Sequence, residues 1–199
     1  ARHPARAFRT HFPLAATVAR FAATHAIEHE LLGVVEPEVL AERYPEIFIA
    51  NISVNPYRPD AIDELEKWAR RGARVVKWLP NAMGIDPSDP KCDPFYQKMK
   101  ELNLILLSHG GEEKAVEAEE DQKLGNPLLL RRALDHGVKV IVAHCAGLGV
   151  NEDLDSKDRQ PVHNFDLFLR LMDEKRYEGL VFGEISAMTQ FNRVGKPLQ

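Results

Sequence analysis

The sequence predicts an α/β fold of the (β/α)8 TIM-barrel type, and three observations support it. Apolar segments alternate with amphipathic helices from residue 47 onward, which is typical of a parallel sheet covered by helices. Neither G-x-G-x-x-G nor G-x-x-x-x-G-K-[ST] occurs, which argues against a nucleotide-binding doubly wound sheet. Polar residues stand at candidate strand ends every 30 to 40 residues or so, near the ~31 residues of one barrel unit: Lys77, His109, His144 and Glu184.

Five apolar segments are the candidate strands of this sheet. They are rich in Val, Ile and Leu, as strands buried on both faces are. They cover residues 47–54, 75–79, 104–108, 138–143 and 180–185.

Helices are expected between these strands. Asp60 and Asn126 stand where side chains cap helix starts, and Gly72 and Gly137 stand where glycines end helices. The helices are expected near residues 60–71, 95–102, 128–136 and 165–172, with loops at 80–94, 110–125 and 147–161.

The first 33 residues differ in composition from the rest. No acidic residue precedes Glu28, whereas four arginines do, which is typical either of a transit peptide or of a basic amphipathic surface helix over 14–32. Residues 1–33 are therefore interpreted as an N-terminal helical segment, and residues 34–199 as a partial barrel. The first residue is Ala rather than Met, so we expect a processed or truncated chain.

Composition restricts the partners. With 44% hydrophobic residues, a net charge of −4 and no apolar run of the ~18 residues that a membrane span needs, we expect a soluble protein. An acidic chain does not attract nucleic acid or anionic membranes. Cys92 and Cys145 form no C-x-x-C pair, so a reducing, cytoplasmic compartment is favoured. The expected partner is a small-molecule substrate, and a homo-oligomer is compatible with this composition.

His109 and His144 each follow an apolar strand and precede a loop that contains glycine. The carboxyl ends of barrel strands carry the chemistry, so the two imidazoles are expected to converge within ~4–7 Å, as ligands of one divalent metal would. A single histidine at a strand end is more often a hydrogen-bonding residue. The repetition of the pattern is what favours a shared site.

Lys77 interrupts an apolar strand, where a charge is costly unless it is paired or faces a polar mouth. Strand alternation places Val76 and Trp78 toward the helices and Lys77 toward the barrel interior. Several roles stay open: an ion pair with a neighbouring acid such as Glu184, an anchor for a substrate carboxylate, a carbamylated metal ligand, or a Schiff-base lysine.

Acidic residues near the strand ends complete the candidate site. Glu184 is expected either to orient an imidazole or to neutralise Lys77, and Glu112, with Glu113, follows His109 closely enough to bind substrate or support the ring. The remaining glutamates up to residue 121 are typical of a solvated helix face. His25 and His29 lack an H-E-x-x-H motif and are interpreted as surface residues.

Four motifs in order resemble those of the amidohydrolase superfamily, over roughly residues 35–193. They are Gly72–Pro80, Leu106–His109, Ile141–Cys145 and Gly183–Ser186. The resemblance is to the metal-dependent hydrolase branch, which includes proteins similar to aminocarboxymuconate-semialdehyde decarboxylase. It implies a distorted barrel and a divalent metal, zinc or alternatively manganese. His109 would be the fifth-strand metal ligand, His144 a second ligand or an acid/base group, and Lys77 a residue of the fourth strand, where some members carry a carbamylated lysine.

The chain departs from that family pattern in two ways. No H-x-H pair occurs, and no Asp follows a further strand, so the five candidate strands would correspond to the third through seventh, with the first, second and eighth not found. The resemblance implies a metal-dependent hydrolase that acts on a small carboxylate-bearing substrate through a metal-activated water, with His144 and Lys77 catalytic. The alternatives are a decarboxylase or lyase on the same fold, and a non-catalytic barrel fragment or binding protein.

Overall fold

The computed structural model describes residues 43–114 and 118–188. Contacts divide the chain into two units, Ala1–Ala50 and Asn51–Gln199, and the fold described below is that of the second. The helix expected over 14–32 and the expected boundary after residue 33 lie outside the described residues.

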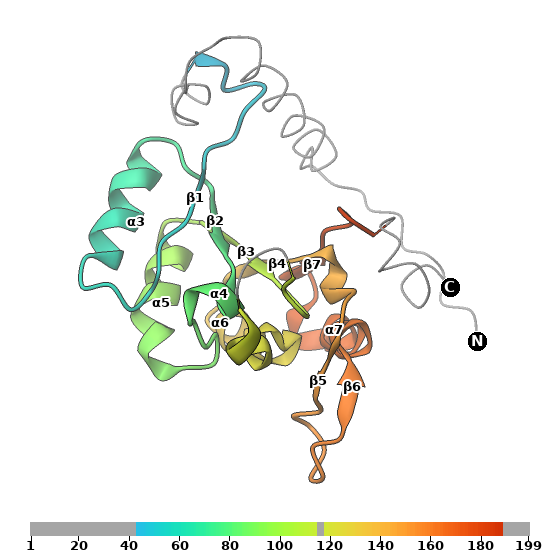
Figure 1. Ribbon diagram of the computed structural model, residues 1–199. Helices are drawn as coiled ribbons and strands as arrows, with labels where there is room; N and C mark the ends of the chain where they lie inside the picture. Colours follow the sequence, from blue (N-terminus) through green and yellow to red (C-terminus); the bar gives the residue numbers. More distant parts are fainter. Residues whose placement is uncertain (1–42, 115–117, 189–199) are drawn as a thin grey trace. The chain divides into compact units, whose positions relative to one another are not determined.

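A five-stranded parallel sheet in the order β1-β2-β3-β4-β7 forms the centre of this unit (Figure 1). Neighbouring strands in this order pair in parallel, and β5 and β6 lie between β4 and β7 in the chain but outside this sheet. All five predicted strands are present, as β1 (Asn51–Ile52), β2 (Val75–Trp78), β3 (Ile105–His109), β4 (Lys139–Ala143) and β7 (Val181–Gly183). The predicted α/β fold is therefore confirmed.

Helices connect the strands. The α-helices are α3 (Ala61–Arg70), α4 (Pro80–Met83), α5 (Asp93–Glu101), α6 (Arg131–Asp135) and α7 (Asn164–Asp173). Short 3₁₀ segments are η1 (Pro90–Cys92), η2 (Glu119–Gly125), η3 (Pro127–Leu130), η4 (His144–Ala146) and η5 (Lys175–Tyr177). No helix in the described ranges is both long and apolar enough to cross a membrane.

The two faces of the sheet differ in burial. One face is fully buried: Val76, Trp78, Leu106, Ser108, Val140 and Val142 are all 0% exposed. The Trp78 ring lies 5.4 Å from that of Phe95 and 5.8 Å from that of Tyr96, both in α5. This face therefore packs against helices, and alternation places Lys77 on the opposite, inner face, as predicted.

Of the two side chains expected to cap helix starts, one does so. The side chain of Asn126 accepts a hydrogen bond from Leu128 N–H at 3.0 Å, as expected for a cap. Asp60 stands at the cap position of α3, but its carboxylate pairs with Arg58 instead of capping. The first strand is shorter than predicted, because it lies at the edge of the described sheet and pairs with β2 over two residues only.

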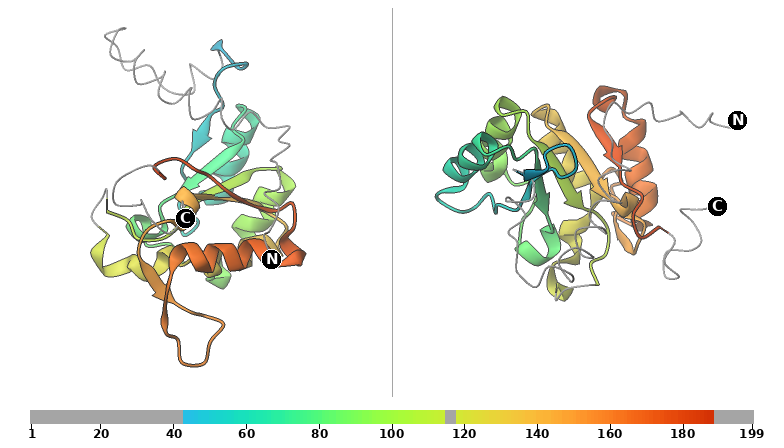
Figure 2. Two further views of the ribbon diagram at one scale, coloured as in Figure 1. Left: turned by 90° about the vertical axis from the view of Figure 1, so that its right-hand side faces the viewer. Right: turned by 90° about the horizontal axis from the view of Figure 1, so that it is seen from above.

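An antiparallel hairpin replaces the irregular loop predicted over 147–161. Its strands are β5 (Val150–Glu152) and β6 (Pro161–His163), and Figure 2 shows it extending beyond α7. The prediction was wrong because these strands have three residues each and bury little apolar surface, so they have no hydrophobic pattern. The loop predicted over 80–94 likewise contains α4 and η1, whose signals are prolines at the helix starts.

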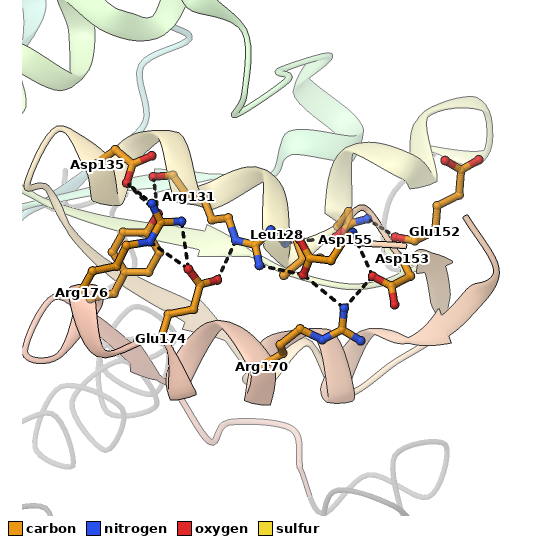
Figure 3. A network of polar contacts seen from close by, with 11 residues as sticks. Leu128, Arg131, Asp135, Glu152, Asp153, Asp155, Arg170, Glu174 and Arg176 are labelled. Carbon is orange, nitrogen blue, oxygen red and sulfur yellow. Dashed lines mark hydrogen bonds and ion pairs between the residues drawn. The ribbon is translucent and has the colours of Figure 1, made fainter. Parts of the chain in front are cut away.

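Arginine–carboxylate pairs hold this hairpin against α6 and α7 (Figure 3). Arg131 donates to both carboxylate oxygens of Asp155, at 2.6 and 2.8 Å, and to Glu174 at 2.7 Å. Arg170 of α7 binds Asp153 and Asp155. A bidentate arginine–carboxylate pair fixes geometry more strongly than a single contact, and several pairs that share partners act together, so the hairpin has a defined position. We call these five residues the hairpin network.

The loops after β2 and β3 meet at Gly125. Its carbonyl accepts a hydrogen bond from Gly111 N–H at 2.7 Å. A Cβ atom on Gly125 would lie 2.1 Å from the Gly111 oxygen and 2.8 Å from Nδ2 of the buried Asn81. Only glycine allows this close approach of two backbones.

We expect Gly125→Ala to lower the free energy of unfolding by about 2–3 kcal/mol, since the added methyl would have to displace backbone rather than a flexible side chain. Urea denaturation followed by circular dichroism measures this. Gly72→Ala is the control, because Gly72 has φ +97° but open space around it and should cost about 1 kcal/mol through its backbone alone. Equal effects of the two substitutions would contradict the packing explanation.

Candidate active site

His109 is the last residue of β3 and is buried, with 4% of its surface exposed. It pairs with Ala143 of β4, so both residues lie on the inner face of the sheet. Its Nε2 lies 3.3 Å from the carbonyl oxygen of Glu112. A carbonyl only accepts hydrogen bonds, so this contact favours the neutral tautomer with its proton on Nε2. Nδ1 lies 3.6 Å from Oε2 of Glu113, beyond hydrogen-bonding distance.

The His144 ring lies beside that of His109 because the backbone changes direction at His144. It follows Ala143, so continued extension would point it to the helix-covered face, away from His109. Instead, His144, Cys145 and Ala146 have φ of 56°, 49° and 51°, the left-handed region. The imidazole rings of His109 and His144 consequently lie 5.6 Å apart, centre to centre, at 63°, within the separation expected from the sequence.

Glu184 and Ser186, which follow β7, stabilise the backbone turn at His144. The backbone N–H of His144 donates to Oε2 of Glu184 at 3.2 Å. Nδ1 of His144 lies 3.0 Å from the carbonyl oxygen and 2.9 Å from Oγ of Ser186, and that Oγ donates to Glu184 Oε2 at 2.7 Å. Ser186 was not identified as a site residue from the sequence, where it ends the Gly183–Ser186 motif two residues after Glu184.

Lys77 lies on the inner face, one strand away from His109. In the described part of the chain its ammonium group has no hydrogen bond and no ion pair within 4 Å, so the ion pair with Glu184 that was one expectation is not formed there. Burial lowers the pKa of Lys77 to about 8, and the carboxylates of Glu184 and Glu113 oppose that decrease. The group is a partly buried cation that has no anion at hydrogen-bonding distance among residues 43–114 and 118–188.

The two glutamates after His109 act differently. The Glu112 carboxylate lies 3.4 Å from Lys114, and it is the Glu112 backbone that contacts His109. Glu113 is buried and is held by Gln122, which accepts from Glu113 N–H at 2.8 Å and donates to its carbonyl at 2.9 Å. Glu113 is therefore the carboxylate beside His109, whereas the side chain of Glu112 interacts with Lys114.

Burial lowers the pKa of His109 to about 4. The nearby charge of Lys77 and the second imidazole, His144, add to this decrease, while Glu113 opposes it. At pH 7 the His109 ring is therefore neutral and has a lone pair on Nδ1.

The described residues do not make a complete metal centre. No group of three or more His, Cys, Asp or Glu side chains within 43–114 and 118–188 is arranged to hold an ion, whereas a catalytic zinc takes three protein ligands and a water. Burial raises the pKa of the Cys145 thiol to about 11, and its Sγ lies 3.5 Å from the carbonyl oxygen of Glu184. His109 and His144 are thus two candidate ligands without a third.

A family model described as amidohydrolase matches residues 5–172 of the chain. The chain belongs to the amidohydrolase family. The match includes both strand-end histidines and Lys77. No curated protein shows a significant match.

Two solved structures are similar to this one. A candidate 2-pyrone-4,6-dicarboxylic acid hydrolase from Pseudomonas putida has a TM-score of 0.51 and 16% identity, over 81% of this chain and 50% of that chain. A second protein described in the same way, from Acinetobacter baumannii, has a TM-score of 0.48 and 15% identity, over 90% of this chain and 77% of that chain. The chain thus spans about half of the P. putida structure. Together with the family and the parallel sheet, the likeness to the P. putida structure confirms a partial TIM-barrel fold.

We expect the free energy of unfolding to fall by about 3 kcal/mol between pH 6.5 and pH 4 because of His109. The unfolded chain takes up this proton near pH 6.5, whereas the folded state resists it until about pH 4, so the stabilisation is present above pH 6.5 and is lost as the pH falls. Urea midpoints across this range measure the effect. His109→Gln should flatten the profile, whereas His163→Gln, at an exposed position, should leave it unchanged.

We expect this 199-residue chain to bind zinc or manganese weakly, with a dissociation constant above about 1 μM, because two imidazoles do not complete a coordination sphere. Isothermal titration calorimetry of the chain with zinc chloride measures this. Any zinc binding that remains in the double variant His109→Asn/His144→Asn occurs at other sites. Sub-micromolar binding that disappears in the double variant would contradict the prediction.

Proposed function

We propose that this chain is part of a hydrolase that acts on a small carboxylate-bearing molecule at the inner face of the sheet. The observation that carries the proposal is Lys77, whose cation has no partner at hydrogen-bonding distance among the described residues, on the face that also bears two adjoining imidazoles. Leaving a charged group in a buried place without an anion is costly. A substrate carboxylate would remove that cost.

Lys77 would bind the substrate. Its pKa of about 8 keeps the ammonium group mostly protonated at pH 7. A charge-assisted hydrogen bond to a carboxylate in a partly buried place is stronger than one between neutral groups. Lys77 thereby fixes the substrate relative to His109 and His144.

His144 would move the proton. With its Nδ1 directed at Ser186, Nε2 is the ring atom that takes a proton from the attacking water while the water oxygen bonds to the substrate carbonyl carbon. The same proton then passes to the leaving group as the bond to that group breaks. Nδ1 of the neutral His109 lies 3.6 Å from the Glu113 carboxylate, so a proton taken up by that nitrogen would be stabilised by Glu113.

Family membership leads us to propose zinc, with manganese as the alternative, as the cofactor, and His109 as one of its ligands. His144 would be either a second ligand or the acid/base group described above, because its Nε2 has a single lone pair. The described residues do not fit a complete site, so none of the steps above passes through a metal. The narrower assignment to the aminocarboxymuconate-semialdehyde decarboxylase-like branch, a cytoplasmic location and a homo-oligomer likewise stay predictions.

A lyase that uses Lys77 as a Schiff base is the second candidate. The observation that favours it is again the lowered pKa of Lys77, because a neutral amine is the nucleophile for a carbonyl. Borohydride reduction in the presence of a small 2-oxo acid, followed by mass spectrometry, distinguishes the two. A reduced adduct on Lys77 favours the lyase, and unmodified Lys77 favours the carboxylate anchor.

We expect Lys77→Met to raise KM for a carboxylate substrate by about 10² while stabilising the fold by about 2 kcal/mol at pH 7, because it removes both the anion-binding cation and the cost of burying it. The assay uses 2-pyrone-4,6-dicarboxylate, and its dimethyl ester as the uncharged probe, with urea denaturation alongside. A panel of small carboxylate-bearing esters and amides extends the search. The absence of hydrolysis across the panel would contradict the proposed function.

Two variants serve as controls for this test. Lys139→Met removes a lysine at the opposite, amino end of β4 and should leave KM unchanged. In the unmodified chain, KM should rise above about pH 8, because Lys77 loses its proton there. Lys77→Arg keeps its charge at high pH, so this rise of KM should be absent in the variant. A wild-type KM independent of pH between 7 and 9.5 would contradict the role of Lys77.

A further inference from the structure

We propose that Ser186 is a positioning residue, which holds the His144 ring through Nδ1 so that Nε2 is the nitrogen directed to the reaction. The inference rests on the proposed function for the role of His144, but the ring assignment itself comes from hydrogen-bond geometry alone. Ser186 contacts neither Lys77 nor His109 in any hydrogen bond between described residues.

The carbonyl oxygen of Ser186 determines which ring nitrogen carries the proton. It lies 3.0 Å from Nδ1 of His144, and a carbonyl oxygen can only accept. Nδ1 therefore donates, and the lone pair of the neutral ring is on Nε2. His109 has the opposite arrangement, with its proton on Nε2 directed at Glu112.

The hydroxyl group of Ser186 connects the same nitrogen to a carboxylate. Oγ lies 2.9 Å from Nδ1 and 2.7 Å from Glu184 Oε2. If Oγ donated to Nδ1, its lone pairs would face the carboxylate oxygen at close range, and Nδ1 would face the carbonyl without a proton. The consistent arrangement is donation from Nδ1 to Oγ and from Oγ to Glu184.

The same carboxylate also supports the backbone that carries the ring. Glu184 accepts from His144 N–H at 3.2 Å and from the backbone N–H of Ser186. A left-handed conformation costs an L-residue about 1–2 kcal/mol, so the turn at His144 depends on bonds of this kind. Ser186 thus joins ring orientation and backbone orientation through one carboxylate.

The chain contains a second copy of the local motif, which serves as a matched control. Ser88 donates from its backbone N–H and from Oγ to Asp86, two residues before it, at 2.8 and 2.7 Å. The contacts to Asp86 resemble those of Ser186 to Glu184, but no hydrogen bond between described residues links Ser88 to a histidine. Removal of the Ser88 hydroxyl therefore measures the effect of losing this local hydrogen-bond motif by itself.

The first test determines directly which nitrogen of the His144 ring carries the proton. Long-range ¹H–¹⁵N spectra of the chain at pH 8, with the His144 signals assigned by their absence in His144→Gln, should show the proton on Nδ1 of His144 and on Nε2 of His109. A proton on Nε2 of His144 would overturn the inference. This measurement needs no substrate, so its outcome is separate from that of the proposed function.

The second test is kinetic and uses the 2-pyrone-4,6-dicarboxylate assay. Ser186→Ala should lower kcat about tenfold or more with KM changed less than about twofold, as expected when a group that orients a catalytic residue is lost. Ser186→Thr, which keeps the hydroxyl, should restore most of kcat, and Ser88→Ala should leave kcat unchanged. An unchanged kcat in Ser186→Ala, or no recovery in Ser186→Thr, would overturn the inference, as would covalent labelling of Ser186 by substrate, which would make it a nucleophile.

Discussion

The left-handed backbone of His144 is the constraint on which the candidate site depends. His109 and Ala143 are paired across β3 and β4, so His144 is one residue too far along its strand to share a face with His109 by simple alternation. The φ of +56° brings its ring back to 5.6 Å from that of His109. Three consecutive non-glycine residues in this region would each cost about 1–2 kcal/mol, and such strain persists only where surrounding contacts determine it. Here those contacts come from Glu184 and Ser186 after β7.

Two buried or partly buried side chains of the candidate site also lower the stability of the fold. Lys77 is a partly buried cation without a close anion in the described residues, and His109 is a neutral imidazole at 4% exposure. Each has a pKa displaced chiefly by burial rather than by a structural ion pair. Groups that cost stability and cluster on one face at the carboxyl ends of parallel strands are typical of a functional site, not of a packing core.

The sequence was sufficient for the features that depend on local pattern. Apolar runs located all five strands, and Trp78 and Val76 could be placed toward the helices because strand alternation has a period of two. The convergence of His109 and His144 was expected from their positions at strand ends, but that argument ignored the one-residue offset between them, and the backbone reversal that compensates for it has no glycine to indicate it. Ser186 and Gln122 were not identified because their roles arise from contacts across 42 and 9 residues. The hairpin at 150–163 was missed because arginine–carboxylate pairs, not apolar burial, define it.

Hydrogen bonds connect that hairpin to the imidazole of His109, and this explains why a polar hairpin on the surface has a defined position. Asn164, fully buried at the start of α7, donates from Nδ2 to the Leu148 carbonyl at 3.0 Å and accepts from Asn151 Nδ2 at 2.9 Å. The same Leu148 carbonyl accepts from Glu112 N–H at 2.9 Å, and the Glu112 carbonyl in turn contacts His109. The loop after β4 is therefore tied both to α7 and to the loop after β3, while the hairpin network anchors its far end through Arg131. Positions of the two rings are thus set from both sides, by Glu184 and Ser186 for His144 and by this chain of backbone contacts for His109.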